Sequence, residues 1–399
     1  MPAISAILMV ASAAGILLET AYRNNSAVEA ALCRFHICDT GQLIDRVHGR
    51  RFELGADAAA LGREEALEAL RRDSASADRW CDAGESLLLA GDAEKAAYAC
   101  RRAVELAPDS PPILWAAASF HWRTGRTRDA IALSRHILEL VRDYDSVVFL
   151  SYARSGLPID ELLGGVPADP AAARRFFEYT VATANTAAAR ELWQWMESRG
   201  YATRPLAARY VDFLLAGRLY AEAAAAWSAY AGGGVHLLRN GGFESEFSGP
   251  GIPSCVFDWT PSGAEHVSEE RDSTAAREGR WSLRIQFDGT DNLNYQGVSQ
   301  AAVVTAGAFR LSAWIKVAGI TTDRGIAMRV FDPESPSRLD VRTAPLAGTA
   351  DWVQVHSDFT VPRGTNLVRV QVFREPSWKF DNKIGGTAWI DGVELLRRQ

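Results

Sequence analysis

The sequence predicts a multi-domain α + β protein, in which an N-terminal α-helical solenoid precedes a C-terminal antiparallel β-sandwich of the jelly-roll type. Small and apolar residues recur at helical spacing over residues 45–231, with a repeat of about 34 residues. Over residues 235–399, apolar and polar residues alternate instead in short segments. The run Gly232–Gly234 separates the two patterns, so the domain boundary is expected there.

Composition excludes several classes of protein. The chain has 399 residues, of which 48% are hydrophobic and 23% charged, as in ordinary folded proteins. At about 150 residues per domain, this length predicts two or three domains. The formal net charge of −6 makes nucleic acid an unfavourable main partner. After residue 18 no stretch is apolar enough to cross a bilayer.

The first residues predict export or membrane anchoring. Pro2–Leu18 carries no charge and would span about 26 Å as a helix, just short of the ~30 Å hydrocarbon core. Residues 1–22 are therefore interpreted as a signal peptide or a signal anchor. The alternative is a buried first helix. The expected location is a bacterial cell envelope, on the periplasmic side, with this segment in the inner membrane if it is retained. Cysteines are expected as free thiols, with a Cys33–Cys38 disulfide as the alternative.

Two consecutive segments, 77–110 and 111–144, can be overlaid. Gly91 then falls on Gly125, and Ala96 on Ala130. Glycine can end one helix in a left-handed turn, and alanine lets two antiparallel helices approach closely.

This spacing resembles that of tetratricopeptide-repeat proteins, and the resemblance covers a helical domain at residues 45–231. Trp80 and Leu87 fill the large apolar positions, and Gly84 is small where the helices meet. Looser hairpins follow at 171–198 and 204–230. A repeat array of this kind presents an extended surface, so a protein partner is expected.

The second half predicts β-strands. Leu283, Ile285 and Phe287 alternate with polar residues, as do the apolar residues of segments 309–317 and 367–373. Such alternation indicates strands with one buried face. About 165 residues suffice for one sandwich core.

Four motifs in this half resemble the galactose-binding-like jelly roll of carbohydrate-binding modules attached to xylanases and laminarinases. They are Leu237–Glu246 (LLRNGGFESE), Glu278–Ile285 (EGRWSLRI), Gly297–Gln300 (GVSQ) and Trp389–Leu396 (WIDGVELL). The resemblance implies a structural calcium ion between the first and last strands. Glu244 and Asp391 would be its side-chain ligands, with backbone carbonyls of the 277–280 loop completing the shell. The alternative is that Asp391 caps a turn and Glu244 is solvated.

A carbohydrate site is expected on the sheet face opposite the core. Aromatic rings stack on sugar rings, while Arg and Gln hydrogen-bond to hydroxyl groups and carboxylates. Several arginines would suit an acidic polysaccharide. The alternative is a second small core beneath a covering loop, and a β-bulge would exchange the two faces. The candidate residues, including two loops that would wall the groove, are Arg310, Trp314, Arg329, Phe331, Arg369, Gln371, Phe373, Arg374, Trp378, Asn294 and Tyr295.

No catalytic motif stands out. The sequence contains no G-x-S-x-G, H-E-x-x-H or phosphate-binding glycine pattern, and its histidines are scattered. Asp332 and Glu334 would suit a solvated turn better than a glycosidase pair. The leading hypothesis is a non-enzymatic exported adaptor for exopolysaccharide or cell-envelope assembly, which binds a protein with its helices and a polysaccharide with its jelly roll. The alternative is a scaffold whose jelly roll docks protein.

Overall fold

The computed structural model describes residues 62–231, 237–246 and 253–398. The predictions for residues 1–22, for Cys33 and Cys38 and for the break at Gly232–Gly234 lie outside these ranges. Within them, no helix combines the length and hydropathy needed to cross a bilayer. Cys100 and Cys255 are buried free thiols, as expected.

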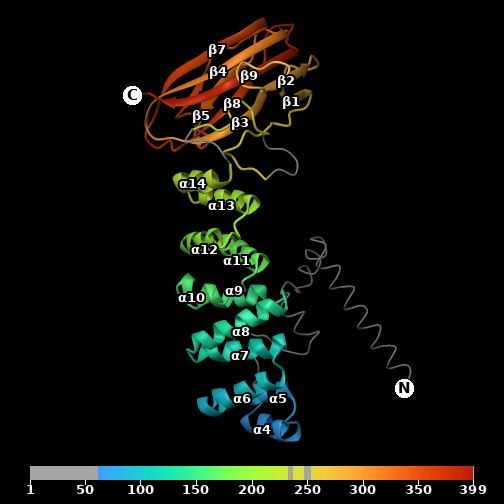
Figure 1. Ribbon diagram of the computed structural model, residues 1–399, viewed down its shortest axis with the longest axis vertical. Helices are drawn as coiled ribbons and strands as arrows, with labels where there is room; N and C mark the ends of the chain where they lie inside the picture. The colour runs from blue at the N-terminus through green and yellow to red at the C-terminus, as the bar shows by residue number, and fades with distance from the viewer. Residues whose placement is uncertain (1–61, 232–236, 247–252, 399) are drawn as a thin grey trace, which may run out of the picture. The chain divides into compact units, whose positions relative to one another are not determined.

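The described chain forms two compact units, with the boundary between Leu133 and Ser134 inside α8. The first unit contains α4 (Arg63–Arg72), α5 (Ala77–Leu89), α6 (Ala93–Leu106), α7 (Pro111–Arg123) and the start of α8 (Thr127–Leu140) (Figure 1).

The helical hairpins of the first unit form as predicted. Leu87, Ala96 and Phe120 belong to one buried cluster. A Cβ on Gly84 would stand 3.5 Å from the Ala96 carbonyl oxygen, which confirms the close approach of the two helices. The turn glycine Gly91 adopts a φ of 82°, where a side chain would be strained.

The helices of the second unit are α9 (Asp145–Arg154), α10 (Ile159–Leu163), α11 (Pro170–Ala182), α12 (Thr186–Ser198), α13 (Arg204–Ala216) and α14 (Tyr220–Ala231). The short α10 lies between α9 and α11 and starts directly after Pro158. Trp227 of α14 is fully buried and donates from Nε1 to an Asp258 carboxylate oxygen at 3.0 Å.

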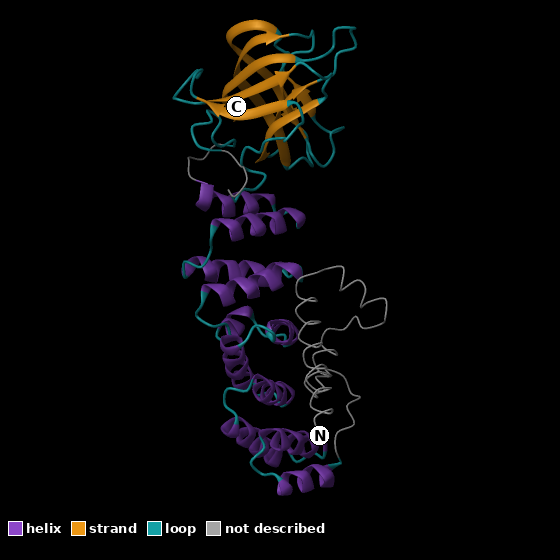
Figure 2. Ribbon diagram, turned by 90° about the vertical axis from the view of Figure 1, so that its right-hand side faces the viewer, coloured by secondary structure: helices purple, strands orange, loops and turns teal. Residues whose placement is uncertain are grey.

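Nine strands follow among the described residues, folded into the two layers visible in Figure 2. They are β1 (Val267–Asp272), β2 (Ser282–Asp288), β3 (Tyr295–Val303), β4 (Gly307–Ile320), β5 (Ala327–Phe331), β6 (Asp340–Arg342), β7 (Gly348–Val361), β8 (Leu367–Arg374) and β9 (Gly385–Arg397). One sheet has the order β1-β2-β9-β4-β7 and the other β3-β8-β5-β6, and the paired strands are antiparallel. The sequence prediction of a β-sandwich is confirmed.

The core lies between the two sheets and is formed by the apolar residues that alternate with polar ones along the strands, as predicted. Leu283, Ile285 and Ile315 of one sheet and Val370 and Val372 of the other have no exposed surface. Burial of such side chains contributes about 1.5–3 kcal/mol each, which makes this layer the main source of stability in the sandwich.

The N-G-G-F-E motif joins the start of the sandwich to its last strand. The amide of Val393 donates to the Gly241 carbonyl oxygen at 2.9 Å. A Cβ on Gly241 would lie 2.0 Å from the Val393 carbonyl oxygen, so only glycine fits there. Asn240 caps the following turn by accepting from the Ser245 amide.

Candidate functional site

The outer face of the four-stranded sheet carries most of the predicted site. Register aligns Gln371 of β8 with Arg329 of β5 and places Arg369 beside Phe331. In the register of β5 with β6, Arg329 lies opposite Arg342. Since residues two apart share one face of a strand, these side chains project away from the Val370 layer.

A network of ion pairs crosses this face. Arg329 binds Asp340 with an Nε–Oδ1 distance of 2.7 Å, and Arg342 contacts the same carboxylate at 3.1 Å. Glu375 pairs with Arg342 and, at 3.5 Å, with Arg324. Burial raises the pKa of Asp340, but hydrogen bonds from Arg329 and Arg342 outweigh burial and lower it overall.

The two phenylalanines of this face are covered by guanidinium groups. Arg329 lies 4.3 Å from the Phe331 ring centroid, and Arg342 lies 5.3 Å from that of Phe373. Phe373 is only 5% exposed. A sugar could stack on either ring only by displacing an arginine that is already in an ion pair.

Gln371 lies beneath the same network. It is 6% exposed, and its Oε1 has no hydrogen-bond partner among the described residues. Its Nε2 reaches the Gly297 carbonyl oxygen at the long distance of 3.5 Å.

A small pocket opens at the end of the sheet where Phe373 lies. Its volume is about 100 Å³, and Arg324, Arg342, Phe373 and Glu375 contribute to its lining. It therefore presents guanidinium donors and a carboxylate acceptor around one aromatic edge, which suits hydroxyl groups of a sugar.

The loop that follows β8 presents two fully solvated aromatic rings. Trp378 is 92% exposed and Phe380 is 104% exposed. Exposed large apolar side chains close together are typical of interaction sites. Glu375, which lines the pocket, belongs to the same loop and precedes Trp378 by three residues.

Arg374 holds this loop in place from below. It is fully buried and donates to the carbonyl oxygens of Arg324 and Asn382 at 3.1 Å each and to Asn292 Oδ1 at 3.2 Å. Burial lowers its pKa. Ser377 adds a hydrogen bond to Asp323 at 2.6 Å. The exposed rings are therefore mounted on an anchored segment.

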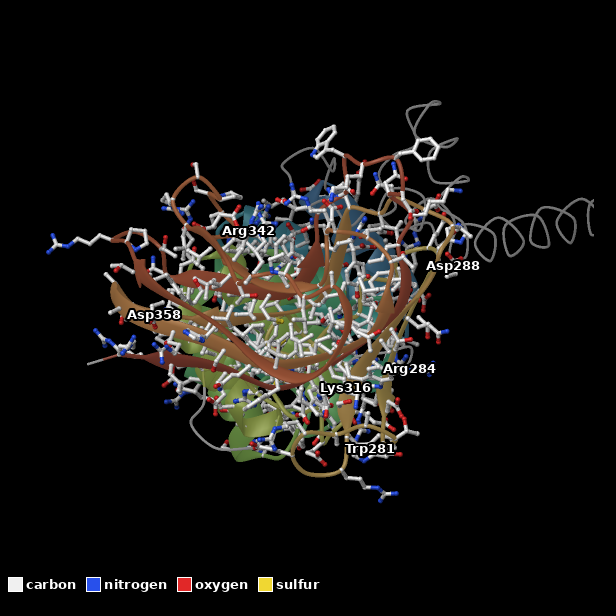
Figure 3. The ribbon with its side chains drawn as sticks, turned by 90° about the horizontal axis from the view of Figure 1, so that it is seen from above. Trp281, Arg284, Asp288, Lys316, Arg342 and Asp358 are labelled. Carbon is white, nitrogen blue, oxygen red and sulfur yellow. The ribbon has the colours of Figure 1, made fainter. Side chains whose placement is uncertain are left out.

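Not all predicted residues share this surface. Arg310 and Trp314 belong to β4, in the other sheet, so their side chains face outward on the opposite side of the sandwich. In Figure 3, Arg342 lies on one side of the sandwich, and Arg284 and Lys316 of the five-stranded sheet lie on the other.

Both residues of β4 already have partners. Arg310 forms an ion pair with Asp358, with an Nη2–Oδ2 distance of 2.6 Å, and Arg277 lies 4.4 Å from the Trp314 ring centroid. A single groove cannot contain both sets.

Two further predicted residues are buried and need correction. Tyr295, expected in a loop that walls the groove, is the first residue of β3, where it is 1% exposed, packs in the core and hydrogen-bonds to Glu269. Arg374 is the loop anchor described above. Asn294 is exposed and accepts from Gln296 Nε2 at 2.9 Å.

Sequence reasoning missed Phe380, Arg324, Arg342 and Glu375. Phe380 could have been predicted from the sequence, because it follows Trp378 by two residues in a polar, proline-containing loop. The other three are brought together only by strand pairing, which a local pattern does not encode.

Asp332 is a structural residue. It is 1% exposed, and its Oδ1 accepts from the amides of Glu334 and Ser335. Arg338 and Thr365 bind its other oxygen, at 2.9 and 2.6 Å. The prediction of a solvated turn is therefore wrong for Asp332, which organises the loop between β5 and β6.

The two carboxylates predicted to bind calcium do lie together. A Cβ on Gly242 would stand 3.5 Å from Asp391 Oδ1 and 3.9 Å from Glu244 Cγ. The 277–281 loop, however, turns N–H groups toward them: Arg280 and Trp281 donate to Glu244 Oε1, and Arg277 and Glu278 donate to Asp391 Oδ2. Burial is the largest effect on the pKa of Asp391 and raises it. Gly392 donates to the other oxygen of Asp391, Oδ1, at 2.7 Å. A cation between the two carboxylates would therefore compete with backbone amides for three of the four oxygens.

Among the described residues, no group of three or more His, Cys, Asp and Glu side chains is placed to hold a metal ion.

Residues 87–148 match the family model of the tetratricopeptide repeat. No curated protein matches the chain.

Solved structures similar to this chain include carbohydrate-binding modules. One is TmCBM61 in complex with β-1,4-galactotriose, at 22% identity over 41% of this chain and 100% of that one, with a TM-score of 0.28. Another is the CBM22-1 xylan-binding domain of Xyn10C from Paenibacillus barcinonensis, at 16% identity over 35% and 85% of the two chains, with a TM-score of 0.26. A CBM4 structure has 14% identity over 40% and 99%, with a TM-score of 0.30. The chain thus combines tetratricopeptide repeats with a β-sandwich whose structural neighbours are carbohydrate-binding modules.

Proposed function

We propose that this protein is a non-enzymatic, exported adaptor that binds a protein partner through its helices and a polysaccharide through its sandwich. The observation that carries the carbohydrate half is the pair of solvated rings Trp378 and Phe380, mounted on the loop that Arg374 anchors. A free indole face stacks on sugar rings, and guanidinium and carboxylate groups hydrogen-bond to their hydroxyl groups.

The adjacent pocket supports a ligand with acidic groups. Arg324 shares the carboxylate of Glu375 with Arg342, which also pairs with Asp340. A uronic acid on the polysaccharide would offer these arginines a further carboxylate.

The protein-binding half is supported by the repeat architecture. Stacked helical hairpins expose a continuous surface that takes peptides or helices. Export, a location in the cell envelope and a role in exopolysaccharide assembly belong to the same proposal and follow from the uncharged N-terminal segment and from the pairing of the two binding functions. A calcium ion between Glu244 and Asp391 would fix the first strand region to the last.

The second candidate function is a scaffold whose sandwich docks protein. One observation favours it: arginines already cover Phe331 and Phe373, so much of the sheet face is closed to sugar.

The test is affinity gel electrophoresis of the full chain against a panel of neutral and acidic polysaccharides. The proposal expects retarded migration in at least one gel, strongest with a uronic acid polymer and weaker at high salt. A folded chain that migrates unretarded in every gel would rule out the carbohydrate half and leave the scaffold.

A further inference from the structure

A pocket of about 240 Å³ lies among helices of the second unit. Its walls come from α9, α10, α11 and α12, which lie mostly after the segment that matches the tetratricopeptide model. Small-molecule sites usually occupy about 300–1,000 Å³, so this pocket suits a single large side chain better than a metabolite.

The pocket has an aromatic floor. Phe149 lies against Phe176 with ring centroids 4.9 Å apart and against Tyr179 at 5.6 Å. Phe149 and Phe176 are 2% and 3% exposed, which fixes their positions. Tyr152 supports them by donating to the Gly165 carbonyl oxygen at 3.0 Å. Such a rigid apolar base favours an aromatic guest, because ring pairs add stabilisation beyond the buried area.

One charged side chain lines the pocket, and it is acidic. Glu191 of α12 lines it and is exposed. Asp160 and Glu161 are also exposed and adjoin Ile159, which lines the pocket from α10. None of these three carboxylates forms an ion pair with another described residue. The charge of Arg154 favours the ionised form of Tyr179, which lines the pocket, so one positive charge also lies near these carboxylates. Charge complementarity therefore selects a basic neighbour for the guest side chain.

We infer that this pocket receives an aromatic side chain, flanked by Lys or Arg, from an extended segment of the partner protein. The inference rests on the proposed protein-binding function and names the chemistry of that partner. Buried aromatic anchors in pockets carry most of the energy of such interfaces, and the surrounding charges set specificity and association rate.

The experiment measures binding of the full chain to an array of nine-residue peptides. The array varies the central residue among Trp, Phe, Leu, Ala and Asp and the flanking residues among Lys, Ser and Glu. Binding is expected to be strongest for Trp or Phe flanked by Lys and to weaken as salt increases.

Two variants test the location. Ala153→Trp fills the mouth of the pocket from an exposed position, and Glu191→Lys reverses its rim charge. Each is expected to weaken binding of the Lys-flanked peptides at least tenfold. The matched controls Ala182→Trp and Glu197→Lys change exposed residues of α11 and α12 outside the pocket and are expected to leave binding within twofold.

The outcomes separate this inference from the proposed function. Peptides that bind equally well to the pocket variants and to the controls would overturn the pocket and leave the protein-binding function standing. A folded chain that binds no peptide of any composition would overturn both. Polysaccharide retardation, measured on the same variants, is expected to be unchanged throughout.

Discussion

Replacing Trp378 by alanine should remove most of the polysaccharide affinity without loosening the fold. The ring is 92% exposed, so almost its whole surface is free to be covered by a ligand. Aromatic side chains bury about 150–250 Å² in full, and a sugar stacked on one face would cover roughly 80–100 Å². At about 25 cal/mol per Å², this amounts to ~2 kcal/mol, or roughly a 30-fold loss of affinity.

The free energy of unfolding of Trp378→Ala should stay nearly unchanged although its polysaccharide affinity falls. A side chain this exposed contributes little packing, and surface substitutions usually change the free energy of unfolding by less than about 0.5 kcal/mol. The assay is affinity electrophoresis in gels of graded polysaccharide content, paired with thermal unfolding of the same samples.

Two further variants show whether the loss of affinity is specific to this loop. Phe380→Ala should weaken binding less than Trp378→Ala does, because the ring is smaller. Tyr98→Ala, which removes an aromatic residue of α6 that is 55% exposed, should leave retardation unchanged. If Trp378→Ala and Phe380→Ala both migrated like the unsubstituted chain, the loop would not be the carbohydrate contact.

Four other perturbations have defined outcomes. Arg374→Met should lower the free energy of unfolding by about 3–5 kcal/mol in urea titrations, because it leaves several buried acceptors without a donor; an unchanged midpoint would contradict its role as anchor. Gly241→Ala should cost about 1–3 kcal/mol in the same titrations, since its Cβ would overlap the Val393 carbonyl. The folded-state pKa of Asp340 is lowered, so its contribution is complete above its ordinary pKa of 3.8 and is lost as pH falls through the lower folded value. The melting temperatures of the unsubstituted chain and Asp340→Asn should therefore converge between pH 5 and strong acid, and a constant gap would refute this. Finally, calcium at about 100 times its dissociation constant should stabilise the chain by about 2.7 kcal/mol, and Glu244→Gln should abolish that gain in calorimetry; equal melting with calcium and with a chelator would exclude the ion.

The sequence predicted the fold well because its main signals are local. Helical spacing and the turn glycine Gly91 are properties of short segments, and so is the alternation that buries Val370. The N-G-G-F-E motif was also readable, although its reason is not local: Gly241 must lie against Val393 of the last strand.

The site was harder to predict because it depends on which strands are neighbours. Alternation shows that Trp314 and Gln371 both point away from the core, but not that β4 and β8 belong to different sheets. The burial of Arg374 was equally hidden. An arginine is expected at the surface, and only the carbonyl groups that converge from distant loops make its burial favourable.

The covered phenylalanines explain why the loop, and not the sheet, should make the first contact with a polysaccharide. A sugar that approached Phe331 would have to displace Arg329 from both the ring and Asp340, which means breaking a partly buried, charge-assisted pair. A sugar that approached Trp378 displaces only water, and the hydrogen bonds around Arg374 have already ordered the loop. Because association then requires little further ordering of the loop, more of the stacking energy remains as affinity.

Loosening the hydrogen bonds of Arg374 should therefore weaken polysaccharide binding, even though Arg374 itself touches no ligand. Arg374→Lys, which keeps the charge but loses the planar fork, should lower polysaccharide affinity along with loop order. Hydrogen exchange at the Ser377 and Lys379 amides measures that order directly, and an Arg374→Lys chain with faster exchange but undiminished affinity would refute the idea that the rings must be held in place.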